Sequence, residues 1–347
     1  MLSKLPNRRR ANSYFLLAAV CFAFSIVFTL RSSSRTQSQD SHSVLASSAL
    51  CLSDLLLKFR IEDSVLHLSA PIYVRLSKPK SVGAACLQKL IGSDAVKNPT
   101  AMELHRLSLL STDEQSHIYR IVHQLHSNFS QMGLELFLAG GSLLGSWRHL
   151  GFIPWDADID FMIQYNQKPL VRQFLVNLSK SEQFNFIDTE LTNQHWQLGI
   201  LCGLVGQNLS ARKQCKTIVD FFFGRVKGRV YDRQEAPRKF PIDYVYPLRV
   251  RPFGPYLLPA PNQPDQFLTA VYGRDFQSNC LFKYFNHMRT DCSYLSKVHS
   301  FVRRLQLTRK GKIIQAELLM KNDQILALFL PEPEGSNFQR QDDSWRE

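Results

Sequence analysis

The clearest hydrophobic pattern in the chain begins about a third of the way along it. Apolar side chains recur there at steps of three and four, the spacing of one buried helix face; they are Ile118, Ile121, Val122, Leu125, Phe129 and Met132. Ser111 with Glu114, or Thr112 with Gln115, has the spacing of a capping box, and Gly133 is suited to end the helix. The pattern predicts an amphipathic helix of about five turns.

Shorter apolar runs after this helix predict several strands. They are Leu134–Ala139, Ile159–Ile163, Phe184–Ile187, Leu198–Cys202, Thr217–Phe223, Tyr244–Val250 and Tyr256–Leu258. Helical spacing recurs in Lys168–Ser179 and in Gln263–Tyr272, and Gly273 follows the second of these. Such a mixture predicts one α/β domain with a mixed sheet, an α+β arrangement, over residues 112–330.

The N-terminal pattern is different, because Tyr14–Leu30 is a run of 17 residues without a charge. As a helix it would be about 25 Å long, at the short limit for crossing a bilayer. Four basic residues precede the run and two follow it, which places the N-terminus, residues 1–13, in the cytosol. We expect an uncleaved signal anchor of a single-pass type II protein. A cleaved signal peptide is the alternative, although its apolar region is usually about 7–15 residues.

Polar composition marks further segments. Residues 31–50 contain eight serines and predict a flexible stem. Residues 51–111 mix short apolar runs with prolines and are expected to form a small lumenal extension packed on the main domain. Residues 331–347 are polar and are expected to form a tail.

The net charge of +13 belongs in part to the anchor, because residues 1–35 contain six basic and no acidic residues. The remaining +7 lies on the body, which we expect in the lumen of the Golgi or the endoplasmic reticulum. That location argues against nucleic acid and favours an anionic substrate as the partner. Asn128, Asn177 and Asn208 each begin an open glycosylation sequon, which also suits the lumen.

Six cysteines follow the anchor, an even number that suits an oxidising compartment. Cys202 with Cys215 and Cys280 with Cys292 are plausible local disulfides by their spacing. Buried free thiols are the alternative for both pairs.

Residues 138–161 carry the candidate chemistry. Gly140, Gly141 and Ser142 follow a predicted strand, where backbone N–H groups at a helix start can bind a phosphate. Arg148 is a further candidate for phosphate binding, with a surface role as the alternative. Three aspartates follow, and in a strand that begins at Asp158 this residue and Asp160 share one face.

Two carboxylates spaced in this way can bind a hard divalent cation that keeps water and phosphate in its shell. A third carboxylate should come from a neighbouring strand. Asp220 is the candidate, because a charge inside the apolar run Ile218–Phe222 is costly unless it is paired or bound to a metal.

The order of these residues resembles the signature of the LicD/fukutin family. Gly140–Gly145 is followed by Arg148-His149 and then by Phe152–Asp160, and a later segment through Pro259–Asn262 to Tyr272-Gly273 is similar to a second motif of that family. The resemblance covers roughly residues 112–290. It implies a nucleotidyltransferase-like fold with metal carboxylates on adjacent strands.

The resemblance also implies a reaction, the transfer of a phospho-alcohol group such as ribitol phosphate or phosphocholine from a CDP-linked donor to a glycan hydroxyl. The acceptor would be a glycoprotein or a glycolipid. Asp158, Asp160 and Asp220 match the family's ligands for Mg²⁺ or Mn²⁺, and Asp156 matches an acidic residue of less certain role. Either Asp220 or Asp156 could accept the proton of the hydroxyl.

Two other functions fit parts of the pattern. A type II glycosyltransferase would also bind a sugar nucleotide through Asp-x-Asp, and an inactive copy could act as a scaffold or chaperone for a glycosylation enzyme. The glycines before the aspartates argue against the first, and retention of all three carboxylates argues against the second. A homo-oligomer is compatible with each of these functions.

Overall fold

The computed structural model describes 200 of the 347 residues. The described residues are 70–81, 110–181, 184–188, 195–201, 214–233, 239–282, 288–296, 299–309, 312–322 and 324–332. Contacts divide the chain into two compact units, one of residues 1–61 and 307–313 and the other of residues 62–306 and 314–347. Of the first unit, the description reaches only the ends of two strands. All other described residues belong to the second unit.

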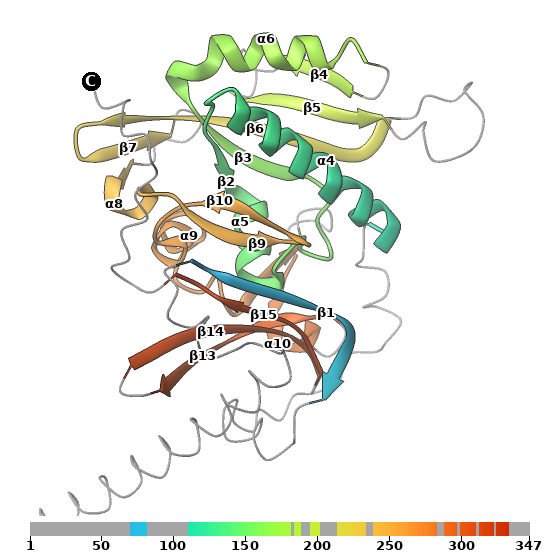
Figure 1. The fold of residues 1–347 in the computed structure, drawn as a ribbon, viewed down its shortest axis with the longest axis vertical. Helices are drawn as coiled ribbons and strands as arrows, with labels where there is room; N and C mark the ends of the chain where they lie inside the picture. The colour runs from blue at the N-terminus through green and yellow to red at the C-terminus, as the bar shows by residue number, and fades with distance from the viewer. Residues whose placement is uncertain are drawn as a thin grey trace, which may run out of the picture. The chain divides into compact units, whose positions relative to one another are not determined.

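A seven-stranded mixed sheet forms the centre of this unit, as the α/β prediction requires (Figure 1). The strands run in the order β2-β3-β6-β5-β4, and β7 and β8 continue from β6. Their bounds are β2 Leu136–Leu138, β3 Ile159–Gln164, β4 Phe184–Asp188, β5 Trp196–Leu201, β6 Gln214–Lys227, β7 Val230–Arg233 and β8 Lys239–Pro241. The two central strands, β3 and β6, are parallel, and the other pairs are antiparallel.

Two helices, α4 (Thr112–Gln131) and α6 (Lys168–Leu178), cover one face of this sheet (Figure 1). Phe129 of α4 stacks on Phe221 of β6, with ring centroids 6.2 Å apart, and meets Phe174 of α6 edge-on at 5.2 Å. The predicted capping box at the start of α4 is present between Ser111 and Glu114, not between Thr112 and Gln115.

Helix α5 (Gly140–His149) packs on β3 and on helix α9 (Pro264–Tyr272), and the hairpin of β9 (Arg249–Phe253) and β10 (Tyr256–Ala260) contacts β2 and α4. Residues 244–248, expected to begin a strand, instead lie in the short helix α8 (Ile242–Val245) and the turn after it. The remaining small elements are the 3₁₀ helix η2 (Tyr165–Gln167), the hairpin of β11 (Asn279–Phe282) and β12 (Met288–Asp291), and α10 (Cys292–Leu295).

A second, four-stranded sheet runs in the order β1-β15-β14-β13, and the pattern of the sequence did not reveal it. Its strands are β1 Ile72–Ser81, β13 Phe301–Arg309, β14 Lys312–Lys321 and β15 Gln324–Leu330. β1 pairs antiparallel with β15 from Ile72 opposite Leu330, so that segments about 250 residues apart in the chain form neighbouring strands.

A buried ionic network joins this second sheet to the last turns of α5. Glu317 of β14 accepts hydrogen bonds from Arg251 at 2.7 Å and from Arg304 at 3.1 Å. Arg251 also donates to Ser146 Oγ of α5 at 3.3 Å, and the Arg304 guanidinium lies 3.6 Å above the ring of Trp147. Burial opposes ionisation of Glu317, but the two guanidinium groups hold its pKa below the ordinary value.

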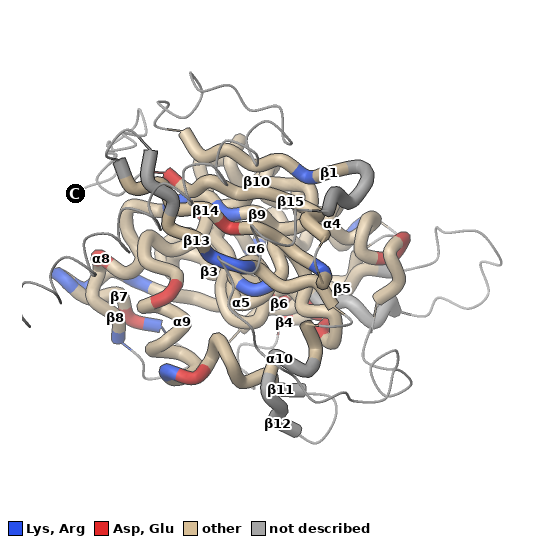
Figure 2. The backbone as a smooth tube through the Cα atoms, turned by 90° about the horizontal axis from the view of Figure 1, so that it is seen from below, with Lys and Arg blue, Asp and Glu red and all other residues tan. Residues whose placement is uncertain are grey.

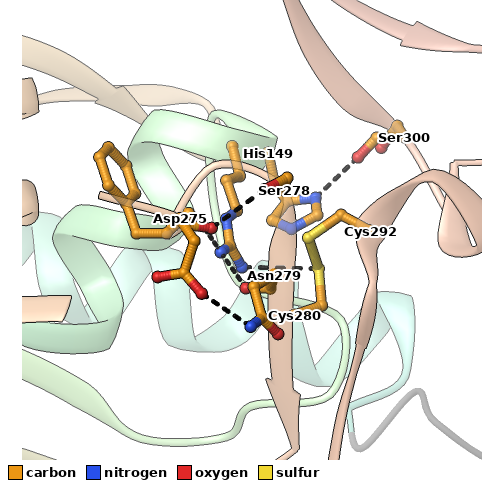
Figure 3. The surroundings of a disulfide bond; sticks show 9 residues. His149, Asp275, Ser278, Asn279, Cys280, Cys292 and Ser300 are labelled. Carbon is orange, nitrogen blue, oxygen red and sulfur yellow. Dashed lines mark hydrogen bonds between the residues drawn. A yellow bond between two sulfur atoms is a disulfide. The ribbon is translucent and has the colours of Figure 1, made fainter. Parts of the chain in front are cut away.

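A disulfide joins Cys280 of β11 to Cys292, the first residue of α10, and confirms one of the two predicted pairs (Figure 3). It lies beside the end of α5, where His149 Nδ1 is 2.7 Å from the carbonyl of Ser300. Asn279, next to the first cysteine, donates from its side chain to Asp275 at 2.9 Å. The other predicted pair involves Cys202, which lies outside the described residues.

Several predictions about the chain's ends also fall outside the description, among them the anchor Tyr14–Leu30 and the stem of residues 31–50. Within the described ranges, no helix is both long enough and apolar enough to cross a membrane. Of the sequon asparagines, Asn128 and Asn177 are exposed on α4 and α6, and Asn208 is not described.

Candidate active site

Helix α5 starts directly after strand β2. Ala139 is still extended, with φ −134°, and Gly140 takes φ +45°, a left-handed value that turns the chain into the helix. Glycine adopts such values without the steric cost that a Cβ imposes. The first turn of α5 therefore begins beside the carboxyl-terminal end of β2 and the start of its neighbour β3.

Asp160 of β3 lies at this N-terminus. The N–H of Gly141 donates to Asp160 Oδ2, and the N–H of Asp160 donates to Ser142 Oγ at 2.9 Å. A helix N-terminus stabilises a negative charge placed at it. The glycines predicted to hold a substrate phosphate thus hold, in this structure, the carboxylate of the chain itself.

The close approach of the carboxylates also explains the two glycines. A Cβ on Gly140 would overlap the Asp160 carboxylate, and one on Gly141 would lie 2.8 Å from Asp156 Oδ2. A side chain at either position would displace one of the aspartates. The motif is therefore shaped around Asp156 and Asp160.

Asp156 and Asp158 complete the acidic group at this end of α5. Burial, a hydrogen bond with Asp158 and the charges of Asp158 and Asp160 together raise the pKa of Asp156 to about 9. Burial is the largest of these causes, and the neighbouring carboxylates add to it. We call Asp156, Asp158, Asp160 and Asp220 the acidic cluster.

Asp220 joins the cluster from β6. It lies opposite Asp160 in the parallel pairing of β3 with β6, so the two side chains share one face of the sheet. The neighbours Val219 and Phe221 are fully buried on the other face. The expectation that Asp220 lies on a neighbouring strand is thus met.

Two polar side chains from β5 and the residue before it hold Asp220. Gln197 Nε2 donates to Asp220 Oδ1 at 2.8 Å, and His195 Nε2 is 3.5 Å from the same oxygen. His195 thus lies at the acidic cluster, whereas Trp196, the next residue in the chain, packs on Phe223 in the core. Gln197 was missed, although it is a polar residue in an otherwise apolar strand.

Arg148, predicted to contact a phosphate, lies in the last turn of α5, at the opposite end from the glycines. It is 5% exposed, and its guanidinium donates to the carbonyls of Phe276 and Asn279. Burial lowers its pKa to about 10. The structure therefore gives Arg148 a structural role at the end of α5 and not a contact with a phosphate.

His149 and Trp155 also pack rather than face the cluster. Their rings meet edge-on at 5.6 Å, and both contact Phe301. Burial is the main reason that the pKa of His149 is lowered to about 3, which keeps it neutral. Neither residue is placed for acid–base chemistry.

The acidic cluster fits a hard divalent cation by the chemistry of its donors, because all of them are carboxylate oxygens. The raised pKa of Asp156 indicates negative charge that a cation would offset. As placed here, no three His, Cys, Asp or Glu side chains among the described residues are arranged so that they could hold a metal ion. Metal binding would require small side-chain movements.

Comparison with known families bears on this site. Residues 133–263 match the family model described as LicD/FKTN/FKRP, nucleotidyltransferase domain. Residues 133–263 therefore carry a domain of the LicD/fukutin type. The match contains α5 and the whole acidic cluster and ends at the start of α9, so that α4 and the four-stranded sheet lie outside it. No curated protein matches the chain.

This match confirms the resemblance predicted from the glycine and aspartate motifs. The family model describes a nucleotidyltransferase domain, and proteins of this family are generally transferases. A transferase of the LicD/fukutin type with a nucleotide-linked donor is accordingly the general function of this domain.

Proposed function

We propose that this domain of the LicD/fukutin type transfers a phospho-alcohol group from a CDP-linked donor to a glycan hydroxyl and releases CMP. The observation that carries the proposal is the acidic cluster, in which Asp160 at the N-terminus of α5 lies beside Asp220 on the adjacent parallel strand. Phosphoryl transfer needs charge neutralisation and positioning more than covalent help from the protein, and the cluster can supply both.

The reaction exchanges one P–O bond for another. The acceptor oxygen attacks the phosphorus that bears the alcohol, a new P–O bond forms, and the bond from that phosphorus to the oxygen of CMP breaks. The hydroxyl proton passes to Asp220 or to Asp156, and because the pKa of Asp156 is raised, Asp156 can accept it only in its ionised form. Mg²⁺ or Mn²⁺, held by Asp158, Asp160 and Asp220, would neutralise charge on the diphosphate.

The remaining roles belong to groups that fix these carboxylates. Gly141 and Ser142 hold Asp160 in place, and Gln197 and His195 hold Asp220. Such fixed donors reduce the reorganisation needed when a substrate binds.

We place the reaction in the secretory pathway, in the Golgi or the endoplasmic reticulum, with Tyr14–Leu30 as the membrane anchor. The disulfide between Cys280 and Cys292 supports this location, because such bonds persist in oxidising compartments.

A donor screen tests the proposal. Full-length protein is incubated with Mg²⁺ or Mn²⁺, a glycoprotein or glycolipid acceptor, and either CDP-linked alcohols or UDP- and GDP-sugars. We expect CMP release from at least one CDP-linked alcohol and no turnover of the sugar nucleotides. Turnover of a sugar nucleotide alone would indicate a glycosyltransferase, and no turnover together with no nucleotide binding would indicate a scaffold.

Matched variants make the screen specific for the cluster. Asp158→Asn should abolish CMP release, whereas Asp188→Asn should leave it unchanged, because Asp188 is an exposed residue of β4 paired with Arg172. Equal loss in both variants would show that the effect is not specific to the cluster.

A further inference from the structure

A group of basic side chains lies where β6, β7 and β8 extend the central sheet, and nothing above assigns it a role. Lys and Arg gather around β7 and β8 in Figure 2. Arg225 of β6 lies opposite Asp232 of β7, which in turn lies opposite Lys239 of β8. Residues that pair directly in this way share one face of the sheet, and Lys227, two residues beyond Arg225, shares it too. We call Arg225, Lys227 and Lys239 the basic face.

The basic face is on the side of the sheet opposite the acidic cluster. Side chains alternate along β6, so that Asp220 points to one face and Arg225 to the other. The Arg225 guanidinium lies 5.7 Å from the ring centroid of Tyr165, the residue that begins the short helix before α6. A ligand of the basic face is therefore not a ligand of the acidic cluster, and its binding does not depend on the proposed reaction.

The basic face holds more positive than negative charge. Asp232 Oδ2 is 2.9 Å from Lys227 Nζ and 3.8 Å from Arg225 Nε. The hydrogen bond from Lys227 is the main reason that the pKa of this carboxyl group is lowered, and the charges of Arg225 and Lys239 lower it further. Three cations thus share one carboxylate, and Arg229, exposed in the turn between β6 and β7, adds a further positive charge nearby.

The side chains of the basic face are open to solvent. The exposed fractions of the Arg225 and Lys227 side chains are 53% and 50%, and Lys239 is also exposed. The large apolar residues of β7 and β8, Tyr231 and Phe240, are buried on the other side of the sheet. This composition is unlike the core of a protein–protein interface, which is apolar or aromatic and depleted of Lys.

Exposed groups of Lys and Arg attract polyanions, among them nucleic acids and acidic polysaccharides. The disulfide between Cys280 and Cys292 argues for an oxidising compartment outside the cytosol, where acidic polysaccharides are the common polyanions. We propose that the basic face binds an acidic polysaccharide, whose anionic groups pair with Arg225, Lys227 and Lys239. Asp232 lies among these cations and weakens their attraction for such a ligand without cancelling it.

Binding of the full-length protein to immobilised heparin, with neutral dextran as the blank, tests the basic face. Wild type should bind heparin, and more weakly as salt rises, because salt screens exposed charges. The variant without the basic face should bind about tenfold more weakly; it combines Arg225→Gln, Lys227→Gln and Lys239→Gln. A matched control removes three positive charges from exposed positions elsewhere and should change the affinity less than about twofold; it combines Arg120→Gln, Lys180→Gln and Arg303→Gln.

Asp232→Asn should change the affinity in the opposite direction, which a loss of folding could not produce. It removes the carboxylate that the three cations share, so heparin should bind severalfold more tightly. No binding of heparin by wild type, equal losses in the two triple variants, or no gain in Asp232→Asn would each overturn the proposal. Tighter binding of polyglutamate than of heparin, lost in the same triple variant, would overturn it as well and would assign the basic face to an acidic protein.

Discussion

The two ends of helix α5 are built for different purposes. At its N-terminus, two glycines and a serine lie beside Asp156 and Asp160, and burial together with the neighbouring carboxylates raises the pKa of Asp156 to about 9. At its C-terminus, Arg148 is buried and bonded to backbone carbonyls. Both ends carry the charge that the helix dipole favours, but only the first places charges of like sign together.

The two ends of α5 differ in whether their residues stabilise the fold or are placed for chemistry. The second end is fixed by the Glu317 network and by the Cys280–Cys292 disulfide, and Glu317 and both cysteines lie outside the residues that match the family model. The first end leaves like charges together, an arrangement that costs stability unless a ligand compensates it. The following variants break one end while they leave the other intact.

The largest effect should come from Glu317→Ala. It would leave Arg251, which is 4% exposed, without its acidic partner, and breaking a buried ion pair in this way costs roughly 3–5 kcal/mol. Denaturant unfolding measures the loss. Gln315→Ala, exposed on the same strand, should change stability by less than about 0.5 kcal/mol. Equal stability of the two variants would refute the role of the network.

Loss of the disulfide should have the next largest effect. The bond closes a loop with a sequence separation of 12 residues, and loop closure of this length is worth about 3 kcal/mol. The double variant Cys280→Ser and Cys292→Ser should therefore unfold at lower denaturant concentration. Reduction of the wild type should lower its stability to the same level, and a wild type that is indifferent to reductant would contradict the prediction.

Gly140→Ala should damage the acidic end. Its Cβ would overlap the Asp160 carboxylate, and displacement of a reactive group by about 1 Å can lower a rate about a hundredfold. Gly133→Ala is a close control, because Gly133 also has a left-handed φ, +67°, but a Cβ there would have no atom of the described residues within 4 Å. Both variants should lose about 1 kcal/mol of stability, whereas only Gly140→Ala should lose CMP release.

The smallest effect should come from Ser111→Ala, which removes the capping box of α4 at the far side of the sheet. Loss of such an N-cap typically costs about 1 kcal/mol. Thermal unfolding should show this loss while CMP release stays unchanged. A change in rate at equal stability would mean that α4 contributes to the site.

Local patterns in the sequence were enough for the elements around the site. The amphipathic spacing of residues 118–132 gives α4, and the alternation after Asp158 correctly puts Ile159 and Phe161 in the core and Asp160 on the other face. The spacing of the glycines and aspartates was enough to indicate the family.

Local patterns in the sequence could not predict contacts between distant segments. β1 pairs with β15 across most of the chain, and Glu317 finds Arg251 from another sheet. The partner of Gly141 was also misjudged, because whether an N–H group faces a substrate phosphate or Asp160 depends on how β3 packs beside α5. Arg148 was misassigned for the same reason, since its burial depends on the β11 segment.

The most direct measurement is CMP release by Asp160→Asn compared with wild type, at a temperature where both remain folded by their unfolding curves. Asp160 is the carboxylate held by α5, and asparagine keeps its size but removes its charge. We predict that the variant unfolds at the wild-type temperature within a few degrees and releases no CMP. A folded Asp160→Asn protein that releases CMP at the wild-type rate would show that the acidic end of α5 does not perform the chemistry.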